Sequence, residues 1–286
     1  MLDQVHLPSL KHKQDDNTYI VGQIAQHKIV ITCLPLGRVG TTSAAVVAEH
    51  MRLTFTSLKF SLLVGIGGGV PSKKFDVRLG DVVVSIPSDT SPGVIQYDFG
   101  KTVQDGRFER TGCLNQPPAF LLSAVARLNS QDILQSSPDR SKISDHLAYI
   151  QAKYPRKPSW SYPGAEKDQL FKSDYDHEPG KSTCADCDLA QLEVRPSRGS
   201  DQPKVHYGLI ASANQVMRNG ATRERLRQET GALCVEMEAA GLMNNFQCLV
   251  IRGICDYADS HKNKDWQLYA AATAAAYARE LLHIIL

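Results

Sequence analysis

Three segments of the sequence place chemically useful residues directly after apolar runs. Glu236 and Glu238 follow one such run, Asp256 follows a second, and the glycine-rich segment 65–69 follows a third. Carboxylates can accept hydrogen bonds or transfer protons, and glycines allow backbone N–H groups to approach a ligand closely because they lack a Cβ atom. These three segments are therefore candidates for a binding or catalytic site.

Each segment also has a purely structural interpretation. A cluster of glycines often marks a tight turn, and segment 65–69 is a poor dinucleotide-binding fingerprint because Val70 occupies the position of the third glycine. Acidic residues in the first turn of a helix commonly interact with the helix dipole, and one carboxylate at a strand end often caps the next helix. Taken singly, no segment decides between structure and function.

A possible metal site lies elsewhere in the chain. Cys184 and Cys187 are separated by two residues, which is a spacing common among metal ligands, and His177 lies nearby. No second pair of cysteines follows, so a structural zinc site is incomplete in the sequence. We expect neither a metal nor a cofactor, and a role in stabilising the loop is the alternative for these cysteines.

The elements that must position the candidate residues follow from the apolar pattern. Two β-rich runs at 19–24 and 28–34 predict a hairpin, and further apolar runs, several of them continuous, alternate with segments of helical spacing. Continuous apolar strands indicate a sheet that is covered on both faces. We therefore predict an α/β fold, arranged as one domain with three αβα layers and a mostly parallel central sheet.

The predicted elements after the hairpin are the following. The strands are expected at 60–64, 81–85, 205–212, 232–235 and 249–254. The helices are expected from Gly37 through 48, at 120–128, at 221–230, from about 239, and from 266 to the last residue. Residues 155–203 are rich in Pro, Ser, Lys and Asp with little periodicity, and we interpret them as a long insertion.

The bulk composition is that of a globular protein. The 286 residues are 42% hydrophobic and 22% charged, and the net charge of +2 offers no argument for binding nucleic acid or a membrane. The seven cysteines are odd in number, and several lie in apolar runs, which is typical of reduced thiols. There is no signal peptide or membrane-spanning run, so we expect a cytoplasmic protein with a small-molecule or protein partner.

Together the three segments resemble a known family. The order Gly-x-Gly-Gly-Gly, Val-Glu-Met-Glu-Ala and Arg-Gly-Ile-Cys-Asp is similar to that of the purine nucleoside phosphorylases and methylthioadenosine nucleosidases. Further motifs at 97–101, 208–212 and 255–263 resemble the nucleoside-phosphorylase-like domain of fungal immune-type receptors. The resemblance covers about residues 18–286 and implies the nucleoside phosphorylase fold, cleavage of a purine N-glycosidic bond, and a homo-oligomer.

The resemblance also implies roles for individual residues. Asp256 would protonate or hydrogen-bond the purine N7, and Glu238 would bind the ribose hydroxyls and stabilise the positive charge that develops on the sugar. Met237 would pack on the sugar, and Glu236 is the less certain member of the acidic pair. The remaining residues that would contact the purine are Ser212, Ala213, Asn214, Val216, and the backbone of Gly67 and Gly68.

The sequence favours hydrolysis over phosphorolysis. Phosphorolytic relatives bind phosphate at positions that correspond here to Leu63 and Ile66, and an apolar pair cannot hold a dianion. Arg38 could instead meet a phosphate on the substrate, which makes ATP a candidate beside adenosine. The alternatives are a phosphate-dependent phosphorylase and a nucleoside-binding or signalling module with weak turnover.

The first seventeen residues do not match what the family implies. Relatives begin with a buried apolar strand followed by an acidic residue that activates the attacking water. Residues 1–17 are too polar for a central strand. We therefore expect the N-terminal strand to be absent from the central sheet, and we expect weak or no hydrolysis by the chain as written.

Overall fold

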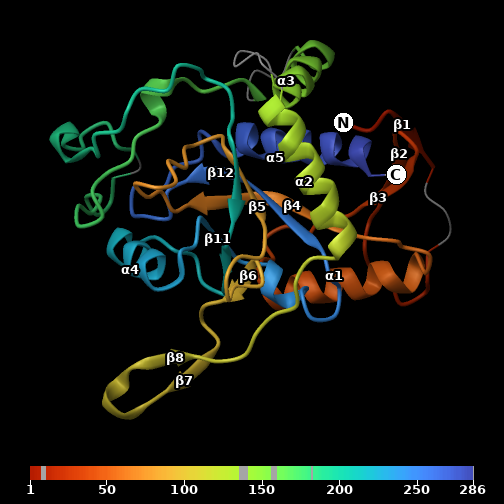
Figure 1. Cartoon of the computed structure of the whole chain (residues 1–286), viewed down its shortest axis with the longest axis horizontal. Coiled ribbons are helices and arrows are strands. Elements are labelled where there is room, and N and C mark those ends of the chain that lie inside the picture. Colours follow the sequence, from red (N-terminus) through yellow and green to blue (C-terminus); the bar gives the residue numbers. More distant parts are fainter. Residues whose placement is uncertain (8–10, 135–140, 156–159, 182, 286) are drawn as a thin grey trace.

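The computed structural model describes residues 1–7, 11–134, 141–155, 160–181 and 183–285. Its centre is a seven-stranded sheet with the order β6-β10-β11-β4-β12-β5-β9 (Figure 1). Four neighbouring pairs are parallel, and the pairs β11/β4 and β12/β5 are antiparallel. In chain order the strands are β4 (Leu62–Gly69), β5 (Val82–Ser85), β6 (Val94–Gln96), β9 (Val205–Gly208), β10 (Ile210–Ser212), β11 (Cys234–Glu236) and β12 (Leu249–Asp256). The expected α/β fold with a mostly parallel sheet is confirmed.

Helices lie on both sides of this sheet (Figure 1). The long helix α5 (Gln267–Ile284) packs on β4 and β12, and α2 (Ala119–Leu134) and α3 (Lys142–Lys153) pack on α5. Below the sheet in Figure 1, α1 (Thr41–Thr54) contacts the 3-10 turn η5 (Ala239–Gly241), and α4 (Gly220–Thr230) lies beyond β11. All residues of β5 and β12 are buried, as their continuous apolar sequences predict.

The expected hairpin forms a sheet of its own. Strands β2 (Ile20–Ile24) and β3 (His27–Ile31) pair antiparallel, with Ala25 at φ 49° in the turn, and β1 (Gln4–His6) pairs with β2. None of the described residues from 1 to 17 belongs to the seven-stranded sheet. This agrees with their polar character.

Two elements differ from the sequence prediction. The single strand expected at 205–212 is two strands that break at Leu209, and β9 and β10 lie far apart in the strand order. Because they are consecutive in the chain, the sheet must curl so that its two ends approach each other. The helix expected from about 239 is only the 3-10 turn η5, since the side chain of Glu236 binds the first backbone N–H groups and fixes a tighter turn.

The glycine-rich segment 65–69 is extended strand and not a tight turn. It is the second half of β4, and none of its glycines has a positive φ. Its glycines are explained by close packing: a Cβ on Gly67 would lie 2.5 Å from the sulfur of Cys234, and one on Gly68 would lie 2.9 Å from Oδ1 of Asp256. The motif therefore allows neighbouring strands and their functional side chains to approach β4.

The described part of the insertion, residues 160–181 and 183–203, has little regular structure. It contains the 3-10 turns η3 (Ala165–Lys167) and η4 (Leu189–Gln191) and an isolated bridge between Phe171 and Leu192. Ion pairs fasten its end to the body: Arg198 lies 2.7 Å from Asp81 at the start of β5. The absence of periodicity in the sequence predicts this irregular structure.

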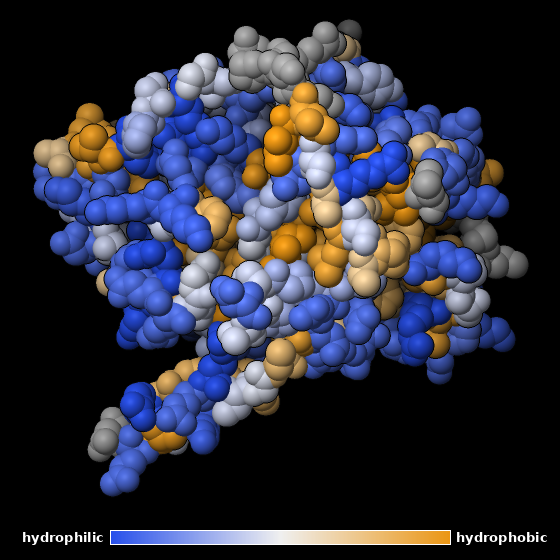
Figure 2. All heavy atoms as spheres, in the orientation of Figure 1, coloured by the Kyte–Doolittle hydropathy of each residue, from blue (hydrophilic) through white to orange (hydrophobic). Residues whose placement is uncertain are grey.

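A second appendage is the hairpin of β7 (Gly100–Thr102) and β8 (Phe108–Arg110), with the 3-10 turn η1 (Gln104–Gly106) between its strands. It projects from the body, and its surface is mostly hydrophilic (Figures 1 and 2). In the part of the chain that the structure describes, no helix combines the length and the apolar character needed to cross a membrane.

Candidate active site

A cavity of about 550 Å³ opens between α1 and β4 and reaches the ends of β11 and β12. This volume lies within the range of small-molecule sites. The fold brings together most of the residues that the sequence singled out. Those on the cavity wall are Gly67, Gly68, Val216, Glu236, Met237, Glu238 and Asp256.

Asp256 is the last residue of β12 and is held by three donors. The Ala258 N–H donates to Oδ1 at 2.9 Å, the Cys255 thiol donates to Oδ2 at 3.0 Å, and the ammonium of Lys262 lies 3.0 Å from Oδ2. Burial raises the pKa of Cys255, so its thiol remains a proton donor. This buried carboxylate is therefore fixed in orientation before any ligand arrives.

Glu236 and Arg252 form a buried ion pair beneath the cavity. The Arg252 guanidinium donates to Glu236, which also accepts hydrogen bonds from the backbone N–H groups of Glu238 and Ala239 at 3.0 to 3.2 Å. Burial opposes the charge of Arg252, but the carboxylates of Glu236 and Glu238 outweigh it and raise the pKa of Arg252. A charged residue inside an apolar strand predicts an acidic partner, because a lone buried charge is costly, and Glu236 is the partner of Arg252. The hydrogen bonds of Glu236 to the backbone indicate that it positions the loop after β11.

Glu238 is more accessible than Glu236, because 16% of its side chain is exposed against 1%. Its Oε2 lies 3.3 Å from Nη2 of Arg252, and its Oε1 accepts a long contact of 3.5 Å from the Gly40 N–H. Arg252 thus orients Glu238 toward the cavity while leaving lone pairs free. Of the two carboxylates after β11, Glu238 is the one available to a ligand.

Some of the expected contact residues do not reach the cavity. Ser212 is buried and accepts a hydrogen bond from the Ala240 N–H at 3.0 Å. Asn214 accepts hydrogen bonds from the backbone and hydroxyl of Thr41 at 2.9 and 3.0 Å. These polar groups hold η5 and the start of α1, and their expected contact with the base stays a prediction.

Two further expected residues also lie off the cavity wall. Ala213 is buried, and its N–H donates to the carbonyl of Glu236 at 3.2 Å. Arg38 is exposed in the loop before α1, whereas the next residue, Val39, lines the cavity. The expected contact of Arg38 with a phosphate stays a prediction.

The apolar residues that argued against phosphate binding do face the cavity. Leu63 and Ile66 both lie on its wall. Among the described residues of the wall the cationic side chains are Arg252 and Lys262, and both are paired with carboxylates. A phosphate dianion would therefore have to break one of these ion pairs.

Lys262 is a functional candidate to which no motif in the sequence assigns a role. It lies six residues after Asp256 in an irregular loop, where no periodicity or motif predicts that it returns to the strand end. The turn at Ala258, with φ 54°, reverses the chain and brings the ammonium back to Asp256. The loop position of His261 predicts an exposed side chain, but the imidazole is buried and stacks on Phe171, with ring centroids 4.0 Å apart.

The edge of β4 that faces away from β12 has no neighbouring strand along residues 62–66 among the described residues. We call this edge the open flank. Leu249 N–H donates to the Ser61 carbonyl, so residues 61, 63 and 65 face β12, whereas 62, 64 and 66 direct their backbone groups to the other side. On that side β11 pairs only with Gly68 and Gly69. Among the described residues no strand covers the open flank, and the cavity runs along it.

Comparison with known proteins identifies the family. The sequence profile of the Phosphorylase superfamily matches residues 4–286. The chain belongs to the phosphorylase superfamily. One relative is a nucleotide-binding leucine-rich repeat (NLR)-like protein of Hyaloscypha variabilis, which is 47% identical to this chain over 286 residues. The match covers 100% of this chain and 28% of that protein, so the chain spans just over a quarter of it.

Other relatives are nucleosidases. The 5'-methylthioadenosine/S-adenosylhomocysteine nucleosidase of Mycobacterium bovis is 23% identical, over 92% of this chain and 83% of that protein. The structure of the same enzyme from Neisseria meningitidis in complex with methylthio-immucillin-A has a TM-score of 0.59 at 16% identity, covering 99% and 90% of the two chains. Futalosine hydrolase of Helicobacter pylori has a TM-score of 0.57 at 16% identity, covering 99% and 88%. At these identities the two structures establish the fold alone.

Proposed function

We propose that this chain cleaves the N-glycosidic bond of a purine nucleoside or nucleotide by hydrolysis. The observation that carries the proposal is that Glu238 and Asp256, from two different strand ends, line one cavity together with Met237. The family and the nucleosidase relatives support it. The whole NLR-like relative is far longer, and the proposal concerns only the part that matches this chain.

The two carboxylates would act on opposite ends of the breaking bond. Cleavage leaves positive charge on the ribose and negative charge on the base. Glu238, free on one side of Arg252, would accept hydrogen bonds from the ribose hydroxyls and stabilise the cationic sugar. Asp256 in its protonated form, or the neighbouring ammonium of Lys262, would donate a proton or a hydrogen bond to the nitrogen of the leaving purine and so offset its negative charge.

Hydrolysis is favoured over phosphorolysis by the wall of the cavity. The side chains of Leu63 and Ile66 are apolar and offer no hydrogen-bond donor to a phosphate. The described cationic side chains of the wall are already paired with carboxylates. A neutral water molecule fits such a surface at lower cost than a dianion does. ATP is a weaker candidate than a nucleoside, because Arg38 lies off the cavity wall.

The same wall supports a second candidate function, a nucleoside-binding module with weak turnover. The described residues of the open flank that line the cavity, from Ser61 to Ile66, include no carboxylate that could activate water. Both Glu238 and Asp256 also hold ion pairs in this structure. A ligand could therefore be held by these groups while hydrolysis proceeds slowly.

A chromatographic screen for released base tests the proposal. The purified chain is incubated with adenosine, inosine, guanosine, methylthioadenosine and ATP, each with and without phosphate. We expect base release that does not depend on phosphate, with free sugar or 5'-substituted sugar as the second product. Ribose 1-phosphate as the main product would establish a phosphorylase, and saturable binding without base release would establish the binding module.

A further inference from the structure

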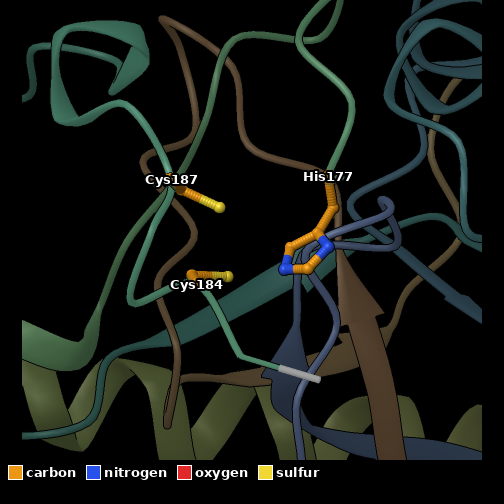
Figure 3. Close-up of side chains that lie close together, drawn as sticks. All are labelled: His177, Cys184 and Cys187. Atoms are coloured by element: carbon orange, nitrogen blue, oxygen red, sulfur yellow. The ribbon is translucent and has the colours of Figure 1, made fainter. Parts of the chain in front are cut away.

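A second cluster of reactive side chains lies outside the cavity, in the insertion. The donor atoms of His177, Cys184 and Cys187 all lie within 4.8 Å of one another (Figure 3). In the sequence a zinc site is incomplete, because no second cysteine pair follows Cys187. The fold supplies a third donor from His177, seven residues before Cys184.

The spacing of the donors suits a tetrahedral ion. With Zn–S bonds of about 2.3 Å, two sulfur ligands of one zinc ion lie about 3.8 Å apart. Donors within 4.8 Å can close to this distance through small side-chain rotations. In Figure 3 the imidazole and both thiols point into the same space. Two thiols and one imidazole form a donor set that Zn²⁺ prefers over Mg²⁺ or Ca²⁺.

The surroundings of each ligand also fit a metal site. The Cys187 N–H donates to the Cys184 carbonyl at 3.1 Å, and this tight turn presents both sulfurs on one side. The imidazole Nδ1 lies 2.9 Å from the Glu178 carbonyl and Nε2 lies 2.9 Å from the Thr183 carbonyl. A neutral imidazole carries one proton, so Nδ1 can donate to Glu178, as the second nitrogen of a zinc-bound histidine usually does. Nε2 would then exchange its contact with the Thr183 carbonyl for the metal.

The position of the cluster connects it to the candidate active site. The His177 N–H donates to the Ser260 hydroxyl at 2.9 Å, and the Cys184 thiol contacts the His261 carbonyl at 3.8 Å. Both partners lie in the loop that follows Asp256. Cys184 and Asp256 also line one small cavity of about 20 Å³. An ion at the cluster would therefore fasten the insertion against the loop that carries Lys262.

Ion pairs such as that between Arg198 and Asp81 hold the end of this segment, and an ion at the cluster would add a link near its middle. The described part of the insertion contains 3-10 turns and one isolated bridge, so ordering it costs conformational entropy with few backbone hydrogen bonds in return. A metal with ligands in a loop commonly contributes to folding in this situation. We propose that His177, Cys184 and Cys187 bind one Zn²⁺ ion, with the fourth position open to water or a further side chain, and that this ion fixes the insertion to the loop after β12.

The metal content of the full chain tests the proposal. The protein is purified without a metal-affinity tag, and its zinc is measured by elemental analysis after dialysis against zinc and then against metal-free buffer. We expect about one zinc ion per chain. The variants Cys184→Ser and Cys187→Ser are expected to bind zinc at least about 10-fold more weakly, and the control Cys113→Ser, which changes an exposed cysteine elsewhere, is expected to retain it.

A spectroscopic readout keeps the test independent of folding defects in the variants. Cobalt replaces zinc in the wild-type chain, and thiolate-to-cobalt charge-transfer absorption is recorded together with the thermal unfolding midpoint. We expect the thiolate band in the wild type and in Cys113→Ser, and a fall of the midpoint when a chelator removes the ion. Wild-type protein with negligible zinc and no thiolate band, or equal zinc content in all three variants and the wild type, would overturn the proposal.

Discussion

The two edges of β4 have different neighbours: one edge pairs with β12, which we call the closed side, and the other is the open flank, along which the cavity runs. Toward β12 the strand is paired from Leu62 to Gly68, and β12 is buried throughout. Along the open flank the cavity takes the place of a neighbouring strand. Val64 and Ile251 are partners in register, yet Val64 is 39% exposed and Ile251 is fully buried. The closed side holds the sheet and positions the carboxylates, whereas the open flank gives a ligand access.

The largest effect is expected at the end of the closed side. Asp256→Asn should lower the rate of base release by about 10²-fold or more, the usual scale for loss of an acid or base, because the amide cannot replace the carboxylate held by Lys262 and Ala258. Steady-state kinetics and the thermal midpoint are measured together. A variant that keeps its wild-type rate would remove Asp256 from the mechanism.

The two glutamates after β11 provide a matched pair. Glu236→Gln should destabilise the fold by about 3–5 kcal/mol, because it leaves the buried Arg252 without its closest counter-charge. Glu238→Ala should instead lower turnover while it changes the unfolding midpoint much less, since Glu238 is more exposed and only shares Arg252. Chemical denaturation and kinetics of both variants distinguish these outcomes. Similar losses of stability in the two would contradict the division of roles.

The register partners test the comparison directly. Ile251→Ala should cost about 2–5 kcal/mol because it opens a hole in the core, whereas Val64→Ala should cost below about 1 kcal/mol because its side chain already contacts solvent. Urea denaturation of the two variants measures the difference. Equal losses would show that the open flank is as tightly packed in solution as the closed side.

A smaller effect than that of Ile251→Ala is expected from covering the open flank. Fusing an apolar, strand-forming segment with an acidic residue to the N-terminus should raise the free energy of unfolding by about 1–2 kcal/mol. The free energy gained by burying apolar area exceeds the entropic cost of ordering the segment only slightly. Base release should also become faster, because the acid can activate water. A fusion of equal length built from Gly and Ser is the control. If the two fusions behave alike, the open flank does not accept a strand.

The homo-oligomer implied by the family resemblance stays a prediction. The same is true of the one-domain organisation and of the boundaries of the insertion at 155–203. Light scattering on the purified chain measures its oligomeric state. Limited proteolysis tests the one-domain organisation and locates the boundaries of the insertion.

The sequence alone determined the family, the α/β class and the identity of the carboxylates, because continuous apolar strands and short motifs at their ends are local properties. It also determined that residues 1–17 cannot form a central strand, since their polar side chains would be buried on both faces. The pairing of Arg252 with Glu236 followed from the cost of burying a lone charge in a strand.

Only the tertiary structure decided which candidates meet. Glu236 and Glu238 are two residues apart and look equivalent in the sequence, but the Glu236 side chain is buried and bound by backbone N–H groups, whereas the Glu238 side chain is more accessible. Lys262 reaches Asp256 through an irregular turn, and His177 reaches Cys184 and Cys187 through a segment without periodicity. Such contacts depend on how loops close over a packed sheet, and this closure is set by long-range packing that no local pattern in the sequence records.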